Sequence, residues 1–585
     1  MKEILTSRGS SQALHNSLVE ETTEVDTNNY YLQRSNSTLN SCDTAVSSIN
    51  SHNANNIISN SNENLGVVPS NVVAIISIEP TLDESKNYAL KDNYDTSTEI
   101  STDGSEVIIP VPQTRTKLWP QVLASVSVSL GNMIIGLISA YTSPALASMS
   151  SPNSTLHISI DGDEASWIGS LMPLGALIGG IIGGALIEKL GRKKTSIVTA
   201  IPFILSWILI ASATNIWMIY ISRAIGGLCV GIASLSLPVY LAEAVQPEMR
   251  GVLGLLPTTI GNAGILIIYV AGTYLDWRYL SVVCAVLSVP FFICMLLIPE
   301  TPRWFIANGK DRAAEKSLQW LRGEGADIST ELSEIQNTYI TSKKENSESL
   351  KISEFKKKAY YKPTLVSLGL MFLQQMCGIN PVIFYTVFIF QVAGSSVDNN
   401  LSTIVVGIVN FGATLVANVF IDRLGRKVLL AISDVAMIVS LTGLGTFFYF
   451  KEHYPHFIDG LGWIPLGSFM VFVIGFSLGA GPIPWLMLGE IFPGRIRGAG
   501  GAIMTAFHWI LTFIVIKAFP AFIAKFGTYT AFFLFEAVCI FGLVFIKYYV
   551  PETRNRSLEE IERKLLRSCR RGRKEKSKPQ QVVRP

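Results

Sequence analysis

Hydrophobic residues occur along this chain in twelve long runs that are separated by shorter polar segments. A helix needs about 20 predominantly apolar residues to cross the ~30 Å hydrocarbon core of a bilayer. Runs of about this length or longer lie at 120–147, 166–187, 196–214, 217–242, 253–273, 278–298, 361–391, 402–421, 428–450, 463–489, 499–524 and 528–549. The pattern therefore predicts an all-α membrane protein with twelve transmembrane helices.

The polar segments divide the chain into five regions. Residues 1–116 are rich in Ser and Asn, and this composition cannot bury enough apolar surface to offset the entropy of ordering. We predict a disordered cytosolic tail there. A first group of six spans (117–299) follows, then a cytosolic linker (300–360) with short amphipathic helices at DRAAEKSLQWLRGEG and ISTELSEIQ. A second group of six spans (361–550) and a cytosolic tail (551–585) complete the chain.

Charge sets the orientation of this arrangement. Only 16% of the residues are charged, against about 25% in a typical soluble domain. Lys and Arg concentrate in alternate loops, and the positive-inside rule places those loops and both termini in the cytosol. The sequons at Asn153 and Asn400 then face outward, where glycosylation is possible. A net charge of +3 indicates no nucleic-acid partner.

Three sequence pairs repeat in the same order in the two groups of spans. EKLGRKK (188–194) matches DRLGRKV (422–428). Glu243 and Arg250 have the same spacing as Glu490 and Arg497, and PETPR (299–303) matches PETRNR (551–556). Many secondary transporters are built from such internal repeats, with the substrate held between them near the midplane.

These motifs resemble the sugar porter branch of the major facilitator superfamily. Further matches are PVYLAE (238–243), QQMCGIN (374–380), GPIPW (481–485) and Arg223 followed by Gly227 and Gly231 at four-residue intervals. Within that branch, SAYTSPAL (139–146) and PTTIGNAGIL (257–266) resemble the insect facilitated trehalose transporters. The resemblance implies a fold of two pseudo-symmetric six-helix halves and a sugar as substrate in a lipid bilayer. The sequence shows no P-loop, nucleophile motif or metal-ligand spacing, so we expect neither enzyme activity nor a cofactor or metal.

Polar side chains inside the spans are candidates for the sugar site. Gln374, Gln375 and Asn380 interrupt span seven and Asn410 interrupts span eight, and the resemblance assigns all four to substrate contacts. The alternative is a set of interhelical hydrogen bonds, each typically worth about 0.6 kcal/mol. Gln374 and Asn380 reach one cavity only if the helix breaks between them, and Gly378 and Pro381 favour such a break.

Aromatic residues are also implied by the resemblance. Trp485 and Trp509 match positions that flank the sugar, and Phe384 and Tyr385 match an outer gate, with ordinary packing as the alternative. The chain departs from glucose transporters at three positions, with Thr258 in place of Gln, Ser477 in place of Glu, and His508 in place of Asn. These changes favour a roomier pocket, consistent with a disaccharide.

The repeated charged motifs are predicted to form an inner gate. Exposed ion pairs contribute about 0–1 kcal/mol each, so several together could hold a reversible closed state. The alternative is that they set orientation only. The candidate network comprises Glu188, Arg192, Arg223, Glu243, Arg250, Glu300, Arg303, Asp422, Arg426, Glu490, Arg497 and Glu552.

The first span bears on the driving force. It contains no Asp, Glu, Lys or Arg, whereas the resemblance implies a carboxylate there in proton-coupled members. We therefore expect facilitative transport of a sugar, trehalose first, across the plasma membrane by alternating access. A hexose facilitator, a proton-coupled symporter and a non-transporting sugar sensor are the alternatives, and the oligomeric state is not indicated.

Overall fold

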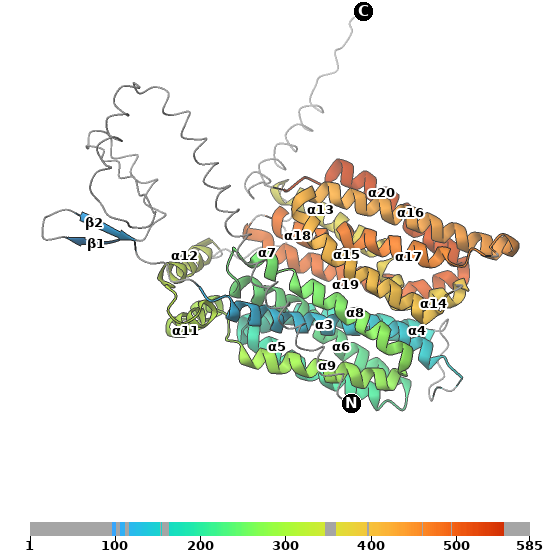
Figure 1. Cartoon of the computed structure of the whole chain (residues 1–585), viewed down its shortest axis with the longest axis horizontal. Coiled ribbons are helices and arrows are strands. Elements are labelled where there is room, and N and C mark those ends of the chain that lie inside the picture. The colour runs from blue at the N-terminus through green and yellow to red at the C-terminus, as the bar shows by residue number, and fades with distance from the viewer. Residues whose placement is uncertain are drawn as a thin grey trace, which may run out of the picture. The chain divides into compact units, whose positions relative to one another are not determined.

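The computed structural model describes residues 96–100, 106–110, 116–152, 154, 163–345, 358–394, 397–458, 460–492 and 494–554. Helices make up almost all of this (Figure 1). The first half consists of α3 (Trp119–Met149), α4 (Asp163–Leu190), α5 (Arg192–Ala211), α6 (Ile216–Ala244), α7 (Arg250–Leu253), α8 (Leu256–Tyr274) and α9 (Trp277–Leu297). We call these helices the N-terminal half.

The second half follows three shorter helices, α10 (Pro302–Ala307), α11 (Asp311–Arg322) and α12 (Ser329–Glu345). It consists of α13 (Lys358–Met376), α14 (Ile379–Ala393), α15 (Asn399–Leu424), α16 (Arg426–His453), η3 (Pro455–Phe457), α17 (Ile464–Gly475), η4 (Phe476–Ala480), α18 (Ile483–Ile491), α19 (Gly494–Phe526) and α20 (Thr528–Tyr549). We call these the C-terminal half.

The described part of the chain contains twelve segments that are long and apolar enough to cross a membrane, as predicted. Large apolar side chains on the outside of the bundle, such as Ile181 at 70% exposure and Val286 at 63%, form the surface that lipid would cover. Consecutive spans alternate in direction. We call the end where α4 and α15 finish, near Leu190 and Leu424, the basic face, and the other end the opposite face.

Glycines let two helices of the N-terminal half approach closely. A Cβ atom on Gly227 of α6 would lie 2.1 Å from the carbonyl oxygen of Met172 in α4, and one on Gly231 would lie 2.1 Å from that of Ala176. Small residues at four-residue spacing allow such backbone contact in membrane helices. The Gly227 and Gly231 spacing seen in the sequence is therefore a packing motif.

Two spans of the C-terminal half are irregular. Gly378 separates α13 from α14 with a φ of 94°, which glycine adopts without strain, so the predicted break is present. Pro381 lies in the first turn of α14, where its missing N–H costs nothing. In span ten the irregularity is a π-helical turn, η4, and Pro482 and Pro484 begin α18.

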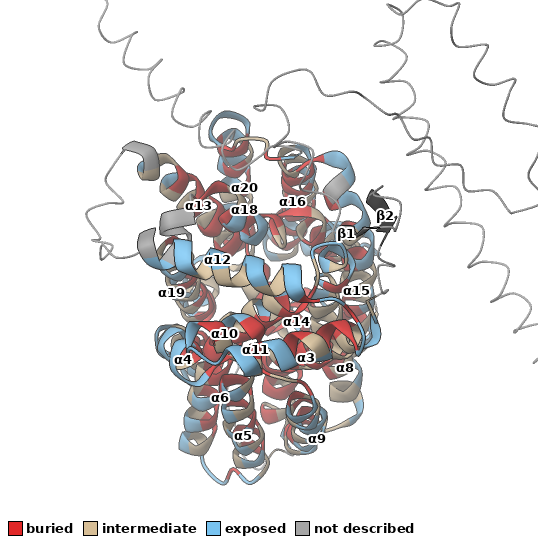
Figure 2. Ribbon diagram, turned by 90° about the vertical axis from the view of Figure 1, so that its left-hand side faces the viewer, coloured by how far each residue is buried: buried red, intermediate tan, exposed pale blue. Residues whose placement is uncertain are grey.

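The linker helices α11 and α12 form where amphipathic helices were predicted. They lie at the basic face, toward the viewer in Figure 2. Arg322 anchors them, because its guanidinium pairs with Glu331 at 2.6 Å and donates to the Ala244 carbonyl of α6 at 2.9 Å.

Most of the predicted N-terminal tail lies outside the described residues. Two short strands within it, β1 (Thr96–Ile100) and β2 (Glu106–Pro110), pair in a two-stranded sheet and belong to a separate unit. Their Thr, Ile and Val residues favour strands. The membrane part of the chain is helical, as expected.

Candidate functional site

A cavity of about 840 Å³ lies between the two halves. It extends to the basic face, where Arg250 and Arg426 border it, and reaches Tyr269 and Ile383 on the side of the opposite face. Its polar lining comes from α8, α13, α14, α15, η4, α18 and α19. The residues are Thr258, Asn262, Tyr269, Gln374, Gln375, Asn380, Asn410, Thr414, Asn418, Ser477, Trp485 and His508.

The helix break between α13 and α14 brings the predicted amides together. Gln375 donates to Nδ1 of His508 at 2.8 Å, and Thr512 donates to Oε1 of Gln375 at 2.8 Å. The amide of Asn380 also donates to Oε1 of Gln375. Gln374 is turned toward span ten, where it donates to the carbonyls of Ala480 and Gly481 at 2.9 and 2.7 Å. We call Gln375, Asn380, His508 and Thr512 the α14 cluster.

A second group of polar side chains joins α8, α15 and η4. Asn410 accepts from Ser477 at 3.0 Å and donates to Oδ1 of Asn262 at 3.3 Å. Asn262 in turn donates to the hydroxyl of Thr414 at 2.8 Å. We call Asn262, Asn410, Thr414 and Ser477 the α15 cluster. Asn410 was expected at the site, whereas Asn262 and Thr414 were not among the predicted residues.

Aromatic rings border the α14 cluster. The Trp485 side chain lines the cavity, is 40% exposed, and meets His508 edge-to-face with ring centroids 4.9 Å apart. Trp509 also meets His508 edge-to-face, with ring centroids 5.0 Å apart, but it does not line the cavity. Thr258 lines the cavity from α8. An indole face beside amide donors and acceptors suits a sugar ring, which has both C–H and hydroxyl surface.

The opposite face is closed by the kink in α14. Tyr385 leaves helical geometry, with φ −127° and ψ 21°, and it stacks on Phe519 at 5.7 Å. The kink frees backbone groups that find partners in the N-terminal half, since Ser143 accepts from the Val387 N–H at 3.1 Å and Tyr269 donates to the Ile383 carbonyl at 3.1 Å. Phe384 and Tyr385 are each 2% exposed. This geometry is the one an outer gate would have when closed.

A cation supports the same closure. Lys517 on α19 donates to Ser166 of α4 at 2.6 Å, pairs with Asp163 at 3.4 Å, and lies 4.3 Å from the Trp167 ring centroid. These contacts cross between the halves. Because the Asp163 side chain is 95% exposed, solvent screens the charges and the ion pair itself contributes little.

At the basic face the charged residues of the N-terminal half form a compact group. Arg192 pairs with Glu243 at 2.9 Å, and Thr301 donates to the other oxygen of Glu243 at 2.7 Å. The buried carboxylate of Glu300 accepts the backbone N–H groups of Arg192 and Lys193 at 3.0–3.1 Å. Those N–H groups begin α5 and have no partner within the helix, so Glu300 acts as an N-terminal cap.

The C-terminal half repeats this geometry. Arg426 pairs with Glu490 at 3.2 Å, and Glu552 accepts the backbone N–H groups of Arg426 and Lys427 at 3.1 and 3.0 Å. Burial opposes ionisation of Glu552, but N–H donors from Arg554, Lys427, Arg426 and Thr553 outweigh it and lower its pKa below the ordinary value. Each Arg–Glu pair lies within its own half. That these residues hold a closed inner gate stays a prediction.

Arg223 does not belong to this inner network, and that prediction was wrong. It lies seven residues into α6, which begins at the opposite face, and its side chain is completely buried. Its guanidinium donates to the carbonyls of Ile168 and Ile138 at 3.1 and 3.0 Å and to the Thr142 hydroxyl at 2.7 Å. A charge inside the membrane requires such partners, and Arg223 thereby ties α3 and α4 to α6.

The remaining predicted residues are less engaged. Arg250 is exposed and donates to the Ala242 carbonyl at 3.1 Å, Glu188 and Arg303 are exposed, and Asn400 lies in the first turn of α15 at the opposite face. Asn153 and the side chains of Asp422 and Arg497 lie outside the described residues. Sequence reasoning missed Ser143, Asn262, Tyr269 and Lys517, although a single polar residue in an apolar run marks Asn262 and Lys517 as it marked Asn410.

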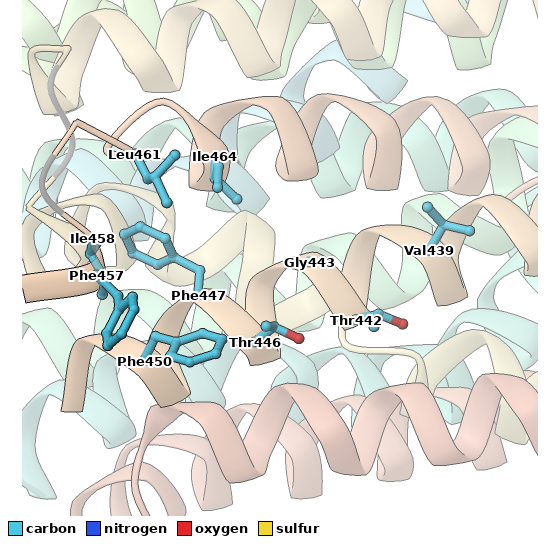
Figure 3. Close-up of a pocket in the computed structure, with 10 residues that line it drawn as sticks. All are labelled: Val439, Thr442, Gly443, Thr446, Phe447, Phe450, Phe457, Ile458, Leu461 and Ile464. Atoms are coloured by element: carbon cyan, nitrogen blue, oxygen red, sulfur yellow. The ribbon is translucent and has the colours of Figure 1, made fainter. Parts of the chain in front are cut away.

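A second cavity of about 660 Å³ lies between α16, η3 and α17 (Figure 3). Phe447, Phe450, Phe457 and several aliphatic side chains line it, with Thr442 and Thr446 as the polar members. Among the residues that the structure describes, its lining contains no amide or charged side chain. This composition does not suit a polyol, so the central cavity is the candidate site.

Comparison with known proteins places these features in context. Residues 124–565 match the family model described as sugar (and other) transporter. The facilitated trehalose transporter Tret1 of Polypedilum vanderplanki is 54% identical over 454 residues, which cover 78% of this chain and 90% of that protein. The Tret1 protein of Culex quinquefasciatus is 56% identical over 453 residues, covering 77% of this chain and 87% of that protein.

Solved structures agree in fold. The proton:xylose symporter XylE bound to 6-bromo-6-deoxy-D-glucose has a TM-score of 0.63 and 25% identity, covering 77% of this chain and 100% of that chain. An inward-open structure of XylE from E. coli has a TM-score of 0.63 and 24% identity, with 75% and 98% covered.

Proposed function

The chain belongs to the sugar transporter family, and on that premise we propose that it carries trehalose across the plasma membrane by facilitated diffusion. One observation carries this proposal. The cavity between the halves combines two clusters of hydrogen-bonding side chains with the exposed ring of Trp485. Relatives at 54–56% identity that are named as facilitated trehalose transporters support the choice of sugar.

The orientation follows from the charge distribution. Lys and Arg residues gather at the basic face, which the positive-inside rule assigns to the cytosol together with both termini. The cavity reaches that face while Phe384 and Tyr385 are buried at the other, and this supports an inward-facing state. Transport then requires a second state in which the opposite face opens and the basic face closes.

The driving force is the sugar gradient alone. The first span, α3, has no ionisable Asp, Glu, Lys or Arg. A proton relay needs a group whose charge changes with state. His508 lies at the cavity, but its ring is hydrogen-bonded to Gln375 and enclosed by Trp485 and Trp509, which supports a fixed structural and ligand-orienting role.

Purified protein in liposomes tests the proposal. We expect labelled trehalose to equilibrate across the membrane at a rate that a pH gradient or a protonophore leaves unchanged. Uptake of glucose without uptake of trehalose would identify a hexose facilitator instead. Concentrative uptake that a protonophore abolishes would identify a symporter, and specific sugar binding without flux would identify a sensor.

A further inference from the structure

We propose that Asn262 is a further sugar-binding residue, which engages the second ring of a disaccharide and thereby sets the preference for trehalose over a single hexose. This inference rests on the proposed function. It concerns how the cavity distinguishes a substrate of two rings from one of a single ring.

The cavity contains two polar clusters and not one. The α14 cluster is centred on Gln375, and the α15 cluster is centred on Asn262 and Asn410. Both line the same cavity, yet among the described residues no side-chain hydrogen bond joins one cluster to the other. A monosaccharide needs only one such group of donors and acceptors. A disaccharide presents a hydroxyl-bearing ring to each.

The size of the cavity fits the same division. Pockets for small molecules span about 300–1,000 Å³, and a cavity of about 840 Å³ lies toward the upper end of that range. A single pyranose ring in this space leaves one cluster without a sugar partner. Two linked rings occupy more of it and reach both.

Asn262 is the amide that the N-terminal half contributes to this lining. It lies four residues beyond Thr258 on α8, which is one helical turn, about 6 Å, toward the opposite face. The Thr258 side chain is a short hydroxyl, whereas an Asn amide offers both donors and an acceptor. The amide that α8 contributes to the cavity wall, Asn262, therefore lies deeper than Thr258.

The present partners of Asn262 are exchangeable. Its Oδ1 accepts from Asn410 at a long 3.3 Å, and its Nδ2 donates to the Thr414 hydroxyl at 2.8 Å. Replacing a hydrogen bond between side chains by one to a sugar hydroxyl has a net effect of only about 1 kcal/mol. Sugar binding can thus draw Asn262 from these partners, which lie in the other half of the protein.

The competing explanation is that Asn262 merely ties α8 to α15. The chain contains a matched control for that role, because Asn418 of α15 donates to the Thr259 hydroxyl of α8 at 3.2 Å. Thr259 does not line the cavity. Thr259→Val removes a link between the same two helices without touching the proposed sugar contact.

The test compares Asn262→Leu, Thr259→Val and wild type in proteoliposomes. We measure the KM of labelled trehalose and the Ki of glucose as a competitor, with thermal unfolding as a check of the fold. For Asn262→Leu we expect the KM of trehalose to rise about 10-fold, as for one lost hydrogen bond, while the Ki of glucose changes less than about 3-fold. Asn262→Gln, which keeps an amide, should recover part of the loss.

Equal changes in both constants, or no change in either, would overturn the assignment. So would a Thr259→Val protein with the same selective loss of trehalose, because that result would make helix contact the cause. If the wild-type protein takes up no trehalose, the proposed function itself is wrong. Wild-type uptake alone shows this, before any variant is compared.

Discussion

The two halves share one arrangement of helices and charged motifs, but they differ in the regularity of their helices and in the hydrogen bonding at the basic face. In the N-terminal half, α3, α4 and α6 are unbroken helices of 31, 28 and 29 residues, and Thr301 completes the bonding of Glu243 at the basic face. In the C-terminal half, spans seven and ten are irregular. There the equivalent atoms, Oε2 of Glu490 and Oγ1 of Thr553, are buried without a hydrogen-bond partner among the described residues.

This difference separates two tasks. Close glycine contacts and the second hydrogen bond to Glu243 favour the N-terminal half as the more rigid platform. The C-terminal half bends at Gly378 and Tyr385, and those irregular positions present Gln375 and Asn380 to the cavity while the kink closes the opposite face. Irregular backbone at membrane depth is tolerated where it lines such a cavity.

The largest expected effect contrasts the sugar contacts of the halves. Gln375→Leu removes both the amide donor and the amide acceptor at the centre of the α14 cluster, and at about 1 kcal/mol or more for each lost bond we expect trehalose uptake to fall about 10- to 100-fold. Thr258→Val on α8 should reduce uptake only a few-fold. Uptake of labelled trehalose in proteoliposomes measures both, and equal losses would remove the distinction between the halves.

Capping at the basic face contrasts the halves in stability. Glu300→Ala leaves the partly buried first N–H groups of α5 without an acceptor and should lower the free energy of unfolding by about 1–3 kcal/mol. Glu552 is more exposed, so Glu552→Ala should cost less. Thermal unfolding in detergent compares the two proteins, and a larger loss for Glu552→Ala would reverse our view of which half is the platform.

Helix packing offers a matched pair of glycines. Gly227→Ala places a Cβ atom against the Met172 carbonyl and should destabilise the N-terminal half by about 1–3 kcal/mol. A Cβ atom on Gly412 of α15 would meet no other atom within 4 Å. Gly412→Ala should therefore be neutral or stabilising by up to about 1 kcal/mol. Similar unfolding temperatures for the two variants would contradict the packing argument.

The smallest effect concerns pH. Because the folded pKa of Glu552 is below its ordinary value, its ionised form stabilises the C-terminal half above that ordinary value. This contribution is lost as the pH falls through the lower folded pKa. The unfolding temperatures of wild type and Glu552→Gln should therefore differ at neutral pH and converge in acid, and a constant difference would show that ionisation is irrelevant.

Particular residues show what the sequence could and could not predict. The lengths of the apolar runs were sufficient to predict the twelve spans, because the thickness of the bilayer fixes the length of each. Gly378 indicated the helix break, because only glycine adopts a φ of this sign easily. The roles of Glu300 and Glu552 as caps were not predictable, since their partners lie over a hundred residues away. Arg223 was assigned from its motif, although the alternation of spans already placed it far from the basic face.

Alternation between the two ends is the central claim, and paired spin labels test it directly. The accessible native cysteines are first replaced by serine. One pair of labelled cysteines then replaces Lys189 and Arg423 at the basic face, and another pair replaces Ser212 and Lys525 at the opposite face. All four positions are exposed. With saturating trehalose we predict a population in which the basic-face distance shortens while the opposite-face distance lengthens. Distances that stay fixed, or that change in the same direction at both ends, would contradict the account.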